Sequence, residues 1–390
     1  MTAKASTDAT VRVVDTLKAI DRASWDAVAN PPHLPFNPFL SHDFLWSLEE
    51  SGAATRRTGW LGQHLVLDGA DGRPVAIMPC YLKSHSMGEY VFDHAWADAY
   101  ERAGGSYYPK LQAAVPFTPV TGRRLLTGDS GNGPALSRLL ADAGAALVRQ
   151  AGVSSLHVTF ATEEDWSVLG GAGYLKRTDQ QYHFVNDGYR DFDDFLDALA
   201  SRKRKTIKRE RRDALTGLDV KLLTGSDLTE AAWDAFFAFY MDTGSRKWGR
   251  PYLNRRFFSL VGERMADRIL LVMASRGGRL IAGALNFIGS EALYGRYWGA
   301  IEEHPFLHFE LCYYQAIDWG IAHGMKVVEA GAQGEHKVAR GYRPTTTYSA
   351  HYIADTRFRR AVADYLASER VQVASDEEAL AEYLPFKASE

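Results

Sequence analysis

The sequence has few of the features that mark disulfide-rich, zinc-binding or membrane-spanning proteins. It contains only two cysteines, Cys80 and Cys312, in 390 residues, which excludes a disulfide framework, and no CxxC pair indicates zinc. No stretch approaches the roughly 18 consecutive apolar residues of a membrane-spanning helix. The N-terminal segment lacks the apolar run of a signal peptide. We therefore expect a cytoplasmic protein with no metal and no transmembrane segment.

The sequence also lacks a large excess of positive or of negative charge. The chain has 45 Lys and Arg against 48 Asp and Glu, for a formal net charge of −3. This balance excludes a protein that coats nucleic acid along its whole length. It permits a local basic patch, and residues 202–212 hold eight Lys and Arg with a single Glu. With 46% hydrophobic residues, the chain can bury a large core, and its length suggests two domains.

Short segments recur along the chain in the same order. The matching pairs are 72–76 with 278–282, 152–160 with 324–331, and 173–184 with 341–352. In the last pair, Gly-Tyr is followed by a His and an aromatic residue at the same internal spacing. Each half reads as a helix, antiparallel strands, a helix, a strand, a loop and a strand. This order matches the acyltransferase fold called GNAT, in which a mixed sheet splays between two central strands and the acyl donor enters the gap.

The expected fold class is therefore α/β (α+β), with tandem GNAT-like domains, each a mixed, mostly antiparallel sheet flanked by helices. The expected ranges are 1–36 for a lead-in, 37–188 for the first domain, 189–365 for the second and active domain, and 366–390 for a C-terminal tail. Within the first domain, residues 84–130 read as a long irregular insertion rich in polar aromatic residues. Such insertions are often binding surfaces.

Five stretches carry a resemblance to a known family: 37–52 (NPFLSHDFLWSLEESG), 81–126, 293–299 (LYGRYWG), 307–324 (LHFELCYYQAIDWGIAHG) and 329–352. They resemble the FemAB-like, peptidoglycan biosynthesis/recognition-related family of predicted N-acyltransferases. The resemblance implies tandem GNAT-like domains that move an acyl group from acyl-CoA or an amino acid from aminoacyl-tRNA. The chain departs from the tRNA-binding Fem enzymes in lacking a heptad-repeat arm, and its junction 300–310 lacks the glycine-rich pyrophosphate loop of GNAT enzymes.

Titratable residues gather in two places of the second half, an expected helix over 308–323 and the loop 329–342. Amide formation needs a base for the attacking amine, donors for the oxyanion and an acid for the leaving group. The predicted catalytic residues are Glu329, His308, Tyr342 and Glu310. Glu329 or His308 would be the base, and Tyr342 or Tyr314 the acid.

Each of these residues also has a structural interpretation. Glu329 can form an ion pair with Arg296 or Lys337, and His308 can be a cap or a partly buried ring. Cys312 lies on the apolar stripe of the expected helix, so we expect it in the core.

Two further groups are predicted to bind ligands. The donor phosphates, or the acceptor carboxylate, would contact Lys337, Arg340, Arg204, Lys208 and Arg211. The last three lie on an expected helix through 192–215. The alternative interpretation is that this basic helix is simply exposed to solvent. The acceptor would contact Tyr90, Asp93, His94, Tyr107 and Tyr108 in the insertion, or these side chains pack between the two halves.

The leading hypothesis is an N-acyltransferase that moves an acyl or aminoacyl group to a small-molecule amine by base-assisted direct attack. Its donor would be acyl-CoA or aminoacyl-tRNA. The alternative is a non-catalytic binding protein for a cell-wall precursor or another anionic ligand. A third interpretation is peripheral membrane contact through residues 202–212.

Overall fold

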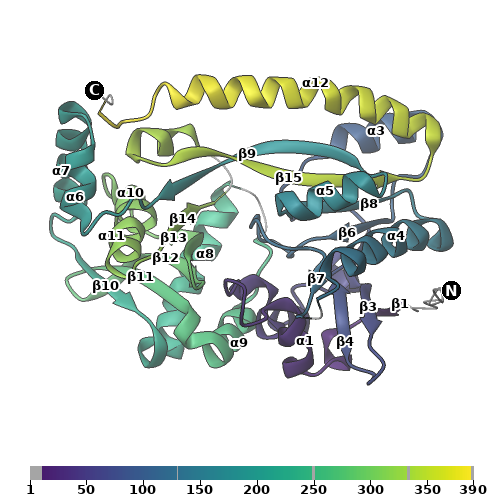
Figure 1. The fold of residues 1–390 in the computed structure, drawn as a ribbon. Helices are drawn as coiled ribbons and strands as arrows, with labels where there is room; N and C mark the ends of the chain where they lie inside the picture. The colour runs from purple at the N-terminus through teal and green to yellow at the C-terminus, as the bar shows by residue number, and fades with distance from the viewer. Residues whose placement is uncertain (1–10, 130, 248–250, 332–333, 388–390) are drawn as a thin grey trace.

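The computed structural model describes residues 11–129, 131–247, 251–331 and 334–387. The first ten residues of the expected lead-in and the last three of the expected tail lie outside this description. The strands form a four-stranded sheet, ordered β1-β3-β4-β7, and an eleven-stranded sheet, ordered β10-β11-β12-β13-β14-β9-β15-β8-β6-β5-β2 (Figure 1). Their bounds are β1 Val11–Val14, β2 Trp60–Gly62, β3 His64–Asp68, β4 Pro74–Met78, β5 Tyr81–Lys83, β6 Lys110–Ala113, β7 Leu126–Thr127, β8 Ser155–Ala161, β9 Leu175–Val185, β10 Asp219–Leu223, β11 Ile269–Arg276, β12 Arg279–Ile288, β13 Ala292–Ala300, β14 Val327–Ala330 and β15 Arg343–Ile353.

Helices pack against both halves of the large sheet. They are α1 Arg22–Ala29, α2 His42–Glu50, α3 His94–Arg102, α4 Gly133–Ala151, α5 Glu163–Gly171, α6 Phe192–Ala198, α7 Ser201–Ala214, α8 Glu230–Lys247, α9 Arg255–Met265, α10 Leu307–Phe309, α11 Gln315–Ala322 and α12 Thr356–Ala381, with a π-helical turn, η6 Glu310–Tyr314, and a 3₁₀ segment, η7 Glu335–Arg340. Together with the sheets they make a mixed α/β fold of two tandem GNAT-like halves, as the sequence predicts.

The two halves exchange their last strands. β9 follows β8 in the chain, but it pairs with β14 of the second half, and β15 follows β14 but pairs with β8 of the first half. β9 and β15 also pair with each other along their length, and α12 lies across both (Figure 1). The large sheet is therefore continuous from one half to the other, although its strands come from alternating parts of the sequence.

The register of β9 with β15 follows the internal repeat. His183 pairs with Arg343, and Leu175 pairs with His351. The repeat aligns Leu175 with Arg343 and His183 with His351. The strand pair His183–Arg343 is therefore the repeat counterpart of the strand pair His351–Leu175. The two strands are thus related by a local two-fold axis, which is the arrangement that a duplicated half would give.

Local sequence accounts for many element boundaries. The Ser41 side chain accepts a hydrogen bond from the Phe44 N–H and begins α2, and Gly52 follows that helix with a left-handed φ of 80°. The single helix expected over 192–215 is instead two, α6 and α7. Leu199 and Ala200 are extended between them, and the Ala200 N–H donates to the Pro385 carbonyl. This contact is long-range in sequence, so helical periodicity gives no sign of it.

Two further ranges contain more regular secondary structure than the sequence analysis predicts. The range 366–390, expected as a tail, contains the second part of α12, which packs on β9 and β15. The insertion 84–130 contains α3, β6 and β7 between irregular segments.

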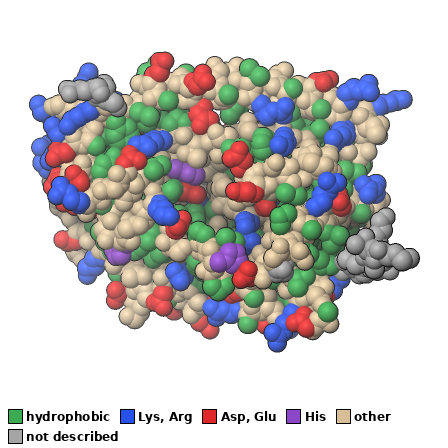
Figure 2. Space-filling view, viewed as in Figure 1, with side chains coloured by type: hydrophobic (Ala, Val, Ile, Leu, Met, Phe, Trp, Pro, Cys, Tyr) green, Lys and Arg blue, Asp and Glu red, His purple; other side chains and the backbone are tan. Residues whose placement is uncertain are grey.

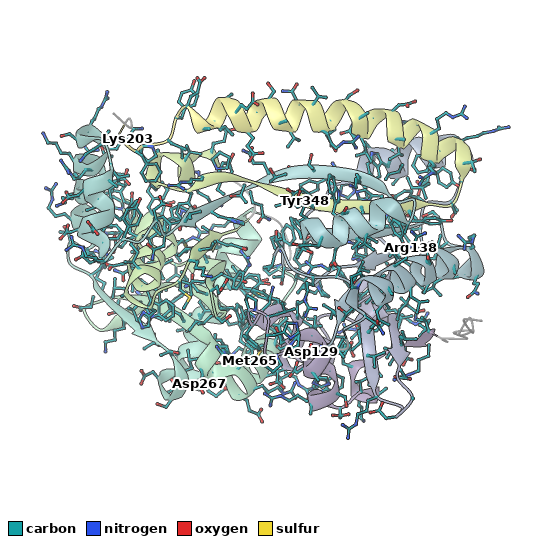
Figure 3. All side chains as sticks on the ribbon, in the orientation of Figure 1. Asp129, Arg138, Lys203, Met265, Asp267 and Tyr348 are labelled. Carbon is teal, nitrogen blue, oxygen red and sulfur yellow. The ribbon has the colours of Figure 1, made fainter. Side chains whose placement is uncertain are left out.

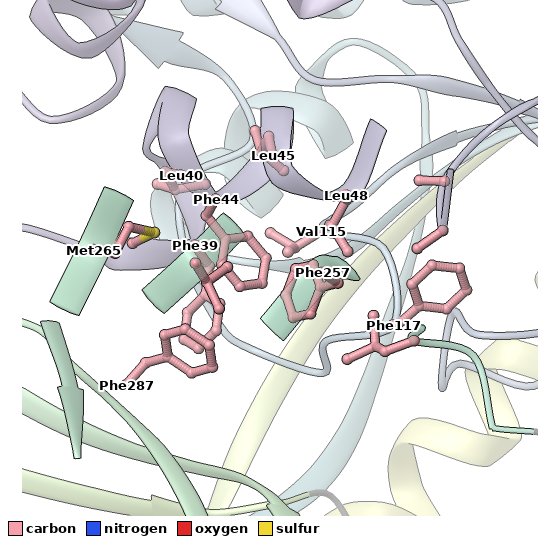
Figure 4. Close-up of a cluster of buried hydrophobic side chains, with 14 of the residues drawn as sticks. Phe39, Leu40, Phe44, Leu45, Leu48, Val115, Phe117, Phe257, Met265 and Phe287 are labelled. Carbon is pink, nitrogen blue, oxygen red and sulfur yellow. The ribbon is translucent and has the colours of Figure 1, made fainter. Parts of the chain in front are cut away.

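A cluster of aromatic side chains joins the two halves (Figure 4). Phe39 and Phe44, beside and on α2, contact Phe287 of β12 with ring centroids 5.0 and 5.3 Å apart, and Phe44 also contacts Phe257 of α9 at 5.8 Å. All four side chains are fully buried. Edge-on contacts between buried aromatic rings stabilise such a core beyond simple burial, so α2 and the second half form one packed unit.

The close contact of α8 with β13 gives the first prediction. A Cβ added at Gly299 of β13 would lie 2.2 Å from the backbone carbonyl atoms of Phe239 in α8, which have no room to move. We expect Gly299→Ala to lower the free energy of unfolding by at least about 1–3 kcal/mol, measured by urea denaturation. Gly171→Ala is the control, because its Cβ meets nothing within 4 Å. It should be neutral or stabilising by about 0.4–1 kcal/mol, and equal losses in the two variants would contradict the packing argument.

Candidate active site

The second half opens a cavity where two parallel strands separate. β13 and β14 pair from Ala292–Val327 to Gly295–Ala330, after which β14 ends and β13 continues to Ala300. A cavity of about 100 Å³ lies at this point. Its lining residues are Ala284, Leu285, Asn286, Gly295, Arg296, Tyr297, Trp298, His308, Cys312, Tyr313, Ala330 and Gly331. The gap that the GNAT fold predicts for the donor therefore exists in this half.

A β-bulge directs one basic side chain into this cavity. Leu285 of β12 pairs with Tyr297, whereas the next residue, Asn286, pairs with Gly295, so Arg296 is the extra residue of β13. Bulges of this kind bend a strand and redirect a side chain, often beside an active site. The Arg296 side chain is only 2% exposed.

Two polar atoms around the cavity have no hydrogen-bond partner among the described residues. They are Oδ1 of Asn286, which is 1% exposed, and Nε of Arg296. Because buried polar atoms are nearly always hydrogen-bonded, such atoms call for a bound group. Two lining residues of the cavity thus each carry a buried polar atom, one acceptor and one donor, without a partner among the described residues.

Glu329 joins Arg296 to a histidine supplied by the exchanged strand. Its carboxylate forms an ion pair with Arg296, one of the structural interpretations that the sequence leaves open, and its Oε1 lies 3.9 Å from Nε2 of His183 on β9. The same nitrogen is 3.3 Å from Oε1 of Gln181. Burial lowers the pKa of His183, against the opposing effect of Glu329, so the ring is neutral at pH 7.

Sequence reasoning omitted His183, Gln181 and Asn286 from the candidate site. His183 and Gln181 lie on a strand of the other half, and only the exchange of β9 brings them to Glu329. The one available signal was the recurrence of His183 as His351 in the repeat.

Lys337 is buried next to the cavity lining. It is 1% exposed and donates to the carbonyl of the lining residue Gly331 over 2.9 Å. Burial, and then the charge of Arg296, lower the pKa of Lys337 to about 7. The expected contact of Lys337 with a donor phosphate stays a prediction.

The helix after β13 carries the other predicted catalytic residues. His308 lines the cavity, with its ring 5.2 Å from those of Trp298 and Tyr313. Cys312, expected in the core, is half-buried and also lines the cavity. Both belong to a stretch with the π-helical turn η6, a distortion that often marks functional sites.

Glu310, Tyr314 and Tyr342 lie outside the cavity lining. The Glu310 carboxylate is fully buried and is bound by Arg211 and Gln315. The Tyr314 hydroxyl donates to Glu210. Tyr342 is fully buried, and burial raises the pKa of its hydroxyl well above the usual value. The two tyrosines and Glu310 therefore serve packing and ion pairs in the structure.

The predicted phosphate-binding cations are all paired with carboxylates, apart from Lys337. Arg340 binds Glu210 at 2.9 Å, Arg204 binds Asp197 at 2.8 Å, Lys208 lies 3.4 Å from Asp193, and Arg211 binds Glu310 at 3.1 Å and Asp318 at 3.1 Å. The sequence could not predict this pairing, because the acidic partners come from different elements.

Two of the five residues predicted to bind the acceptor, Asp93 and Tyr107, lie in a buried polar cluster of the first half. Asp93 accepts from Lys110 at 2.5 Å and from the Tyr107 hydroxyl at 2.6 Å, and all three are at most 2% exposed. Tyr107 is also 3.2 Å from His157 of β8, and the two histidines His157 and His351 share a contact of 2.7 Å between their Nδ1 atoms. Burial lowers the pKa of His157 to about 3, so this ring is neutral. His351 comes from β15, so these side chains pack between the halves, the alternative that the sequence leaves open.

This cluster is the counterpart of the cavity site. His351 pairs with His157 of β8 just as His183 pairs with Glu329 of β14. In the first half, Asp93, Tyr107 and Lys110 are hydrogen-bonded to one another beside His157. The two halves thus use the same strand pairing twice, with different side chains around it.

The other residues of the insertion point to different places. The Tyr108 hydroxyl donates to Ser86 at 2.8 Å, and His94 is exposed. Tyr90 is half-buried with a left-handed φ of 59°, an unusual conformation for a bulky residue. Burial raises the pKa of its phenol.

One face of the molecule has a depression. Figure 2 shows a depression near the centre of one face, below the crossing strands, with histidine, acidic and basic side chains around it. Within the described ranges, no helix is both long and apolar enough to cross a bilayer, and no three His, Cys, Asp or Glu side chains are placed to hold a metal ion.

The buried state of Lys337 gives a prediction for the pH dependence of stability. Because its pKa is about 7 when folded and near 10.5 when unfolded, the unfolded chain binds the extra proton between these values, and stability rises with pH. Lys337→Met removes this effect. We expect its stability relative to wild type to fall by up to about 1.4 kcal/mol per pH unit between pH 7.5 and 9.5, measured by urea denaturation.

The exposed residue Lys205 provides the control for this measurement. Lys205→Met should run parallel to wild type over the same range. Parallel behaviour of Lys337→Met would show that the ammonium is not destabilised by burial.

Comparison with known proteins agrees with the fold and with the expected family. The model of the FemAB-like family, described as peptidoglycan biosynthesis/recognition, matches residues 16–388. The solved structure of FemX superposes with a TM-score of 0.55 at 11% identity, covering 88% of this chain and 98% of FemX. A tandem GNAT protein from the clavulanic acid biosynthesis pathway gives 0.45 at 12%, covering 89% and 99%, and L-PGS from Bacillus licheniformis gives 0.49 at 10%, covering 86% and 97%. No curated protein matches the sequence. The likeness to these structures concerns the fold, and the family match over nearly the whole length shows that the chain belongs to the FemAB-like family.

Proposed function

We propose that this protein is an N-acyltransferase that transfers an acyl or aminoacyl group to a small-molecule amine in the cavity between β13 and β14. The observation that carries the proposal is the cavity itself, at the separation of the two strands, with an unpartnered acceptor on Asn286 and an unpartnered donor on Arg296 among the described residues. Membership of the FemAB-like family supports the same chemistry. The donor would be acyl-CoA or aminoacyl-tRNA.

The proposed chemistry uses Arg296, which lines the cavity, and Glu329 and His183, which are connected to it through the Arg296–Glu329 ion pair. The acceptor amine attacks the donor carbonyl carbon, a C–N bond forms, and the C–S or C–O bond to the donor breaks. The neutral His183 ring would take the proton from the amine nitrogen, and the carboxylate of Glu329 3.9 Å away would stabilise the imidazolium that results. Arg296 would stabilise negative charge on the carbonyl oxygen.

The first half would shape the acceptor side. Tyr90 and Phe117 both hold strained left-handed conformations, with φ of 59°. The Tyr297 hydroxyl, beside Arg296, donates to the Phe117 carbonyl over 3.0 Å. Strain of this kind persists only where the surroundings enforce it, and it is often found at ligand sites.

Two substitutions test the proposed base. His183→Gln and Glu329→Gln should each lower kcat by about 100-fold or more, because positioned base catalysis contributes roughly 10²–10⁴ in rate. The measurement is steady-state transfer of a radiolabelled acyl group to an amine acceptor. Glu335→Gln is the matched control, since Glu335 is exposed on the same loop, and it should leave kcat within about threefold. Near-normal turnover of both site variants would place the reaction elsewhere.

The half-buried thiol of Cys312 allows a test of direct attack. If the amine attacks the donor directly, Cys312→Ser should keep turnover within about threefold, because no covalent intermediate forms on the enzyme. Loss of turnover, together with an acyl adduct on Cys312 in intact-protein mass spectrometry of the wild type, would contradict direct transfer.

A non-catalytic binding protein is the second candidate function. The observation in its favour is size: the cavity of about 100 Å³ is smaller than the roughly 300–1,000 Å³ of typical ligand pockets. Under this alternative, donors would fail to raise the melting temperature and no transfer would be detected with either donor class.

A further inference from the structure

A second, larger cavity lies outside the cavity between β13 and β14. Its volume is about 340 Å³, and it is formed by α7, the η6 turn and the η7 segment. Its lining residues are Arg202, Lys203, Thr206, Ile207, Glu210, Tyr314, Ala339 and Arg340. Tyr313 faces the first cavity and Tyr314 the second, so the η6 turn is the wall between them.

The cations of α7 fall into two classes. Arg204, Lys208, Arg211 and Arg212 each have a carboxylate within ion-pair distance. Arg202, Lys203, Lys205 and Arg209 have none among the described residues. Only Arg202 and Lys203 of this second class line the cavity, on the helix face that also carries Thr206, Ile207 and Glu210 at spacings of three and four.

The inner wall of the cavity contains the ion pair of Glu210 with Arg340. Glu210 binds Arg340 at 2.9 and 3.0 Å and accepts from the Tyr314 hydroxyl. Arg340 is 8% exposed, and its Nε atom has no partner within the described part of the chain. A buried guanidinium nitrogen without an acceptor indicates a missing anion or polar group.

The two cations without a carboxylate partner that line the cavity lie at the N-terminal end of a helix, where positive charge is least favourable. Arg202 and Lys203 lie in the first turn of α7, which has no acidic residue and no side-chain cap. The N–H groups and the dipole of a helix start are already positive, so two cations there raise the local potential further. Around the cavity, three cations oppose the single carboxylate of Glu210, which leaves an excess of two positive charges. Figure 2 shows basic side chains gathered at this edge of the molecule, and Figure 3 shows Lys203 at the end of α7.

We propose that this cavity binds the phosphate ester of a small molecule. A dianionic phosphate matches the excess charge, and Arg202, Lys203 and Nε of Arg340 supply the donors that phosphate oxygens accept. The concave shape of the site and the buried Arg340 favour a small molecule over RNA, which is bound along an extended track of cations. The site does not depend on the transfer reaction, since phosphate binding is measurable whether or not the first cavity is catalytic.

The test measures binding of pyrophosphate by isothermal titration calorimetry to the full chain. Arg202→Ala with Lys203→Ala should weaken binding at least tenfold. Lys205→Ala with Arg209→Ala is the matched control, because it removes the same two charges from the same helix at exposed, unpaired positions, and it should change the affinity less than threefold. Arg340→Lys, which keeps the charge beside Glu210, should weaken binding at least threefold.

Three results would overturn the proposal. The first is equal loss in the two double variants, which would reduce the effect to the net charge of α7. The second is no binding of pyrophosphate or inorganic phosphate by wild type. The third is binding of a single-stranded RNA whose affinity falls equally in both double variants and steeply with salt, which would make α7 an RNA surface.

Discussion

The antiparallel pairing of β9 with β15 is the contact on which the molecule depends. It joins the two halves into one continuous sheet. It also places β9 beside β14 of the second half and β15 beside β8 of the first half. Without the exchange, His183 would lie next to β8 and would not contact Glu329. The candidate site is therefore a product of both halves, although its cavity is lined only by residues of the second.

The same symmetry relates the cavity site to the buried cluster of the first half. In the first half, the equivalent of the His183–Glu329 contact is the neutral pair His351–His157, and Lys110, Asp93 and Tyr107 are hydrogen-bonded to one another beside it. A buried lysine and carboxylate are costly unless paired, and here Lys110 and Asp93 form an ion pair at 2.5 Å. In the second half, the corresponding carboxylate, Glu329, pairs with Arg296, which lines the cavity.

Much of the fold could be predicted from the sequence, and the site only in part. Caps such as Ser41, the repeat around His183 and His351, and alternating strands gave the element order and the two halves, because these are local signals. Glu329 and His308 were predicted from their residue types; His308 lines the cavity and Glu329 pairs with the lining residue Arg296, while their catalytic roles stay predictions. The partners of Arg204, Arg211 and Arg340 could not be found, because ion pairs join separate elements of the chain. The break at Leu199 and Ala200 was missed for the same reason, since the segment that holds it comes from the far C-terminal part of the chain.

The central claim is that the space between β13 and β14 is the donor site, and a structure with donor bound tests it most directly. Crystals would be soaked with acetyl-CoA and, separately, with a non-hydrolysable aminoacyl-adenosine amide. The account predicts that one of the two places its carbonyl oxygen within hydrogen-bond distance of Arg296, between the separating strands. Electron density for both compounds only in the α7 cavity, with the strands β13 and β14 still closed around an empty space, would contradict it.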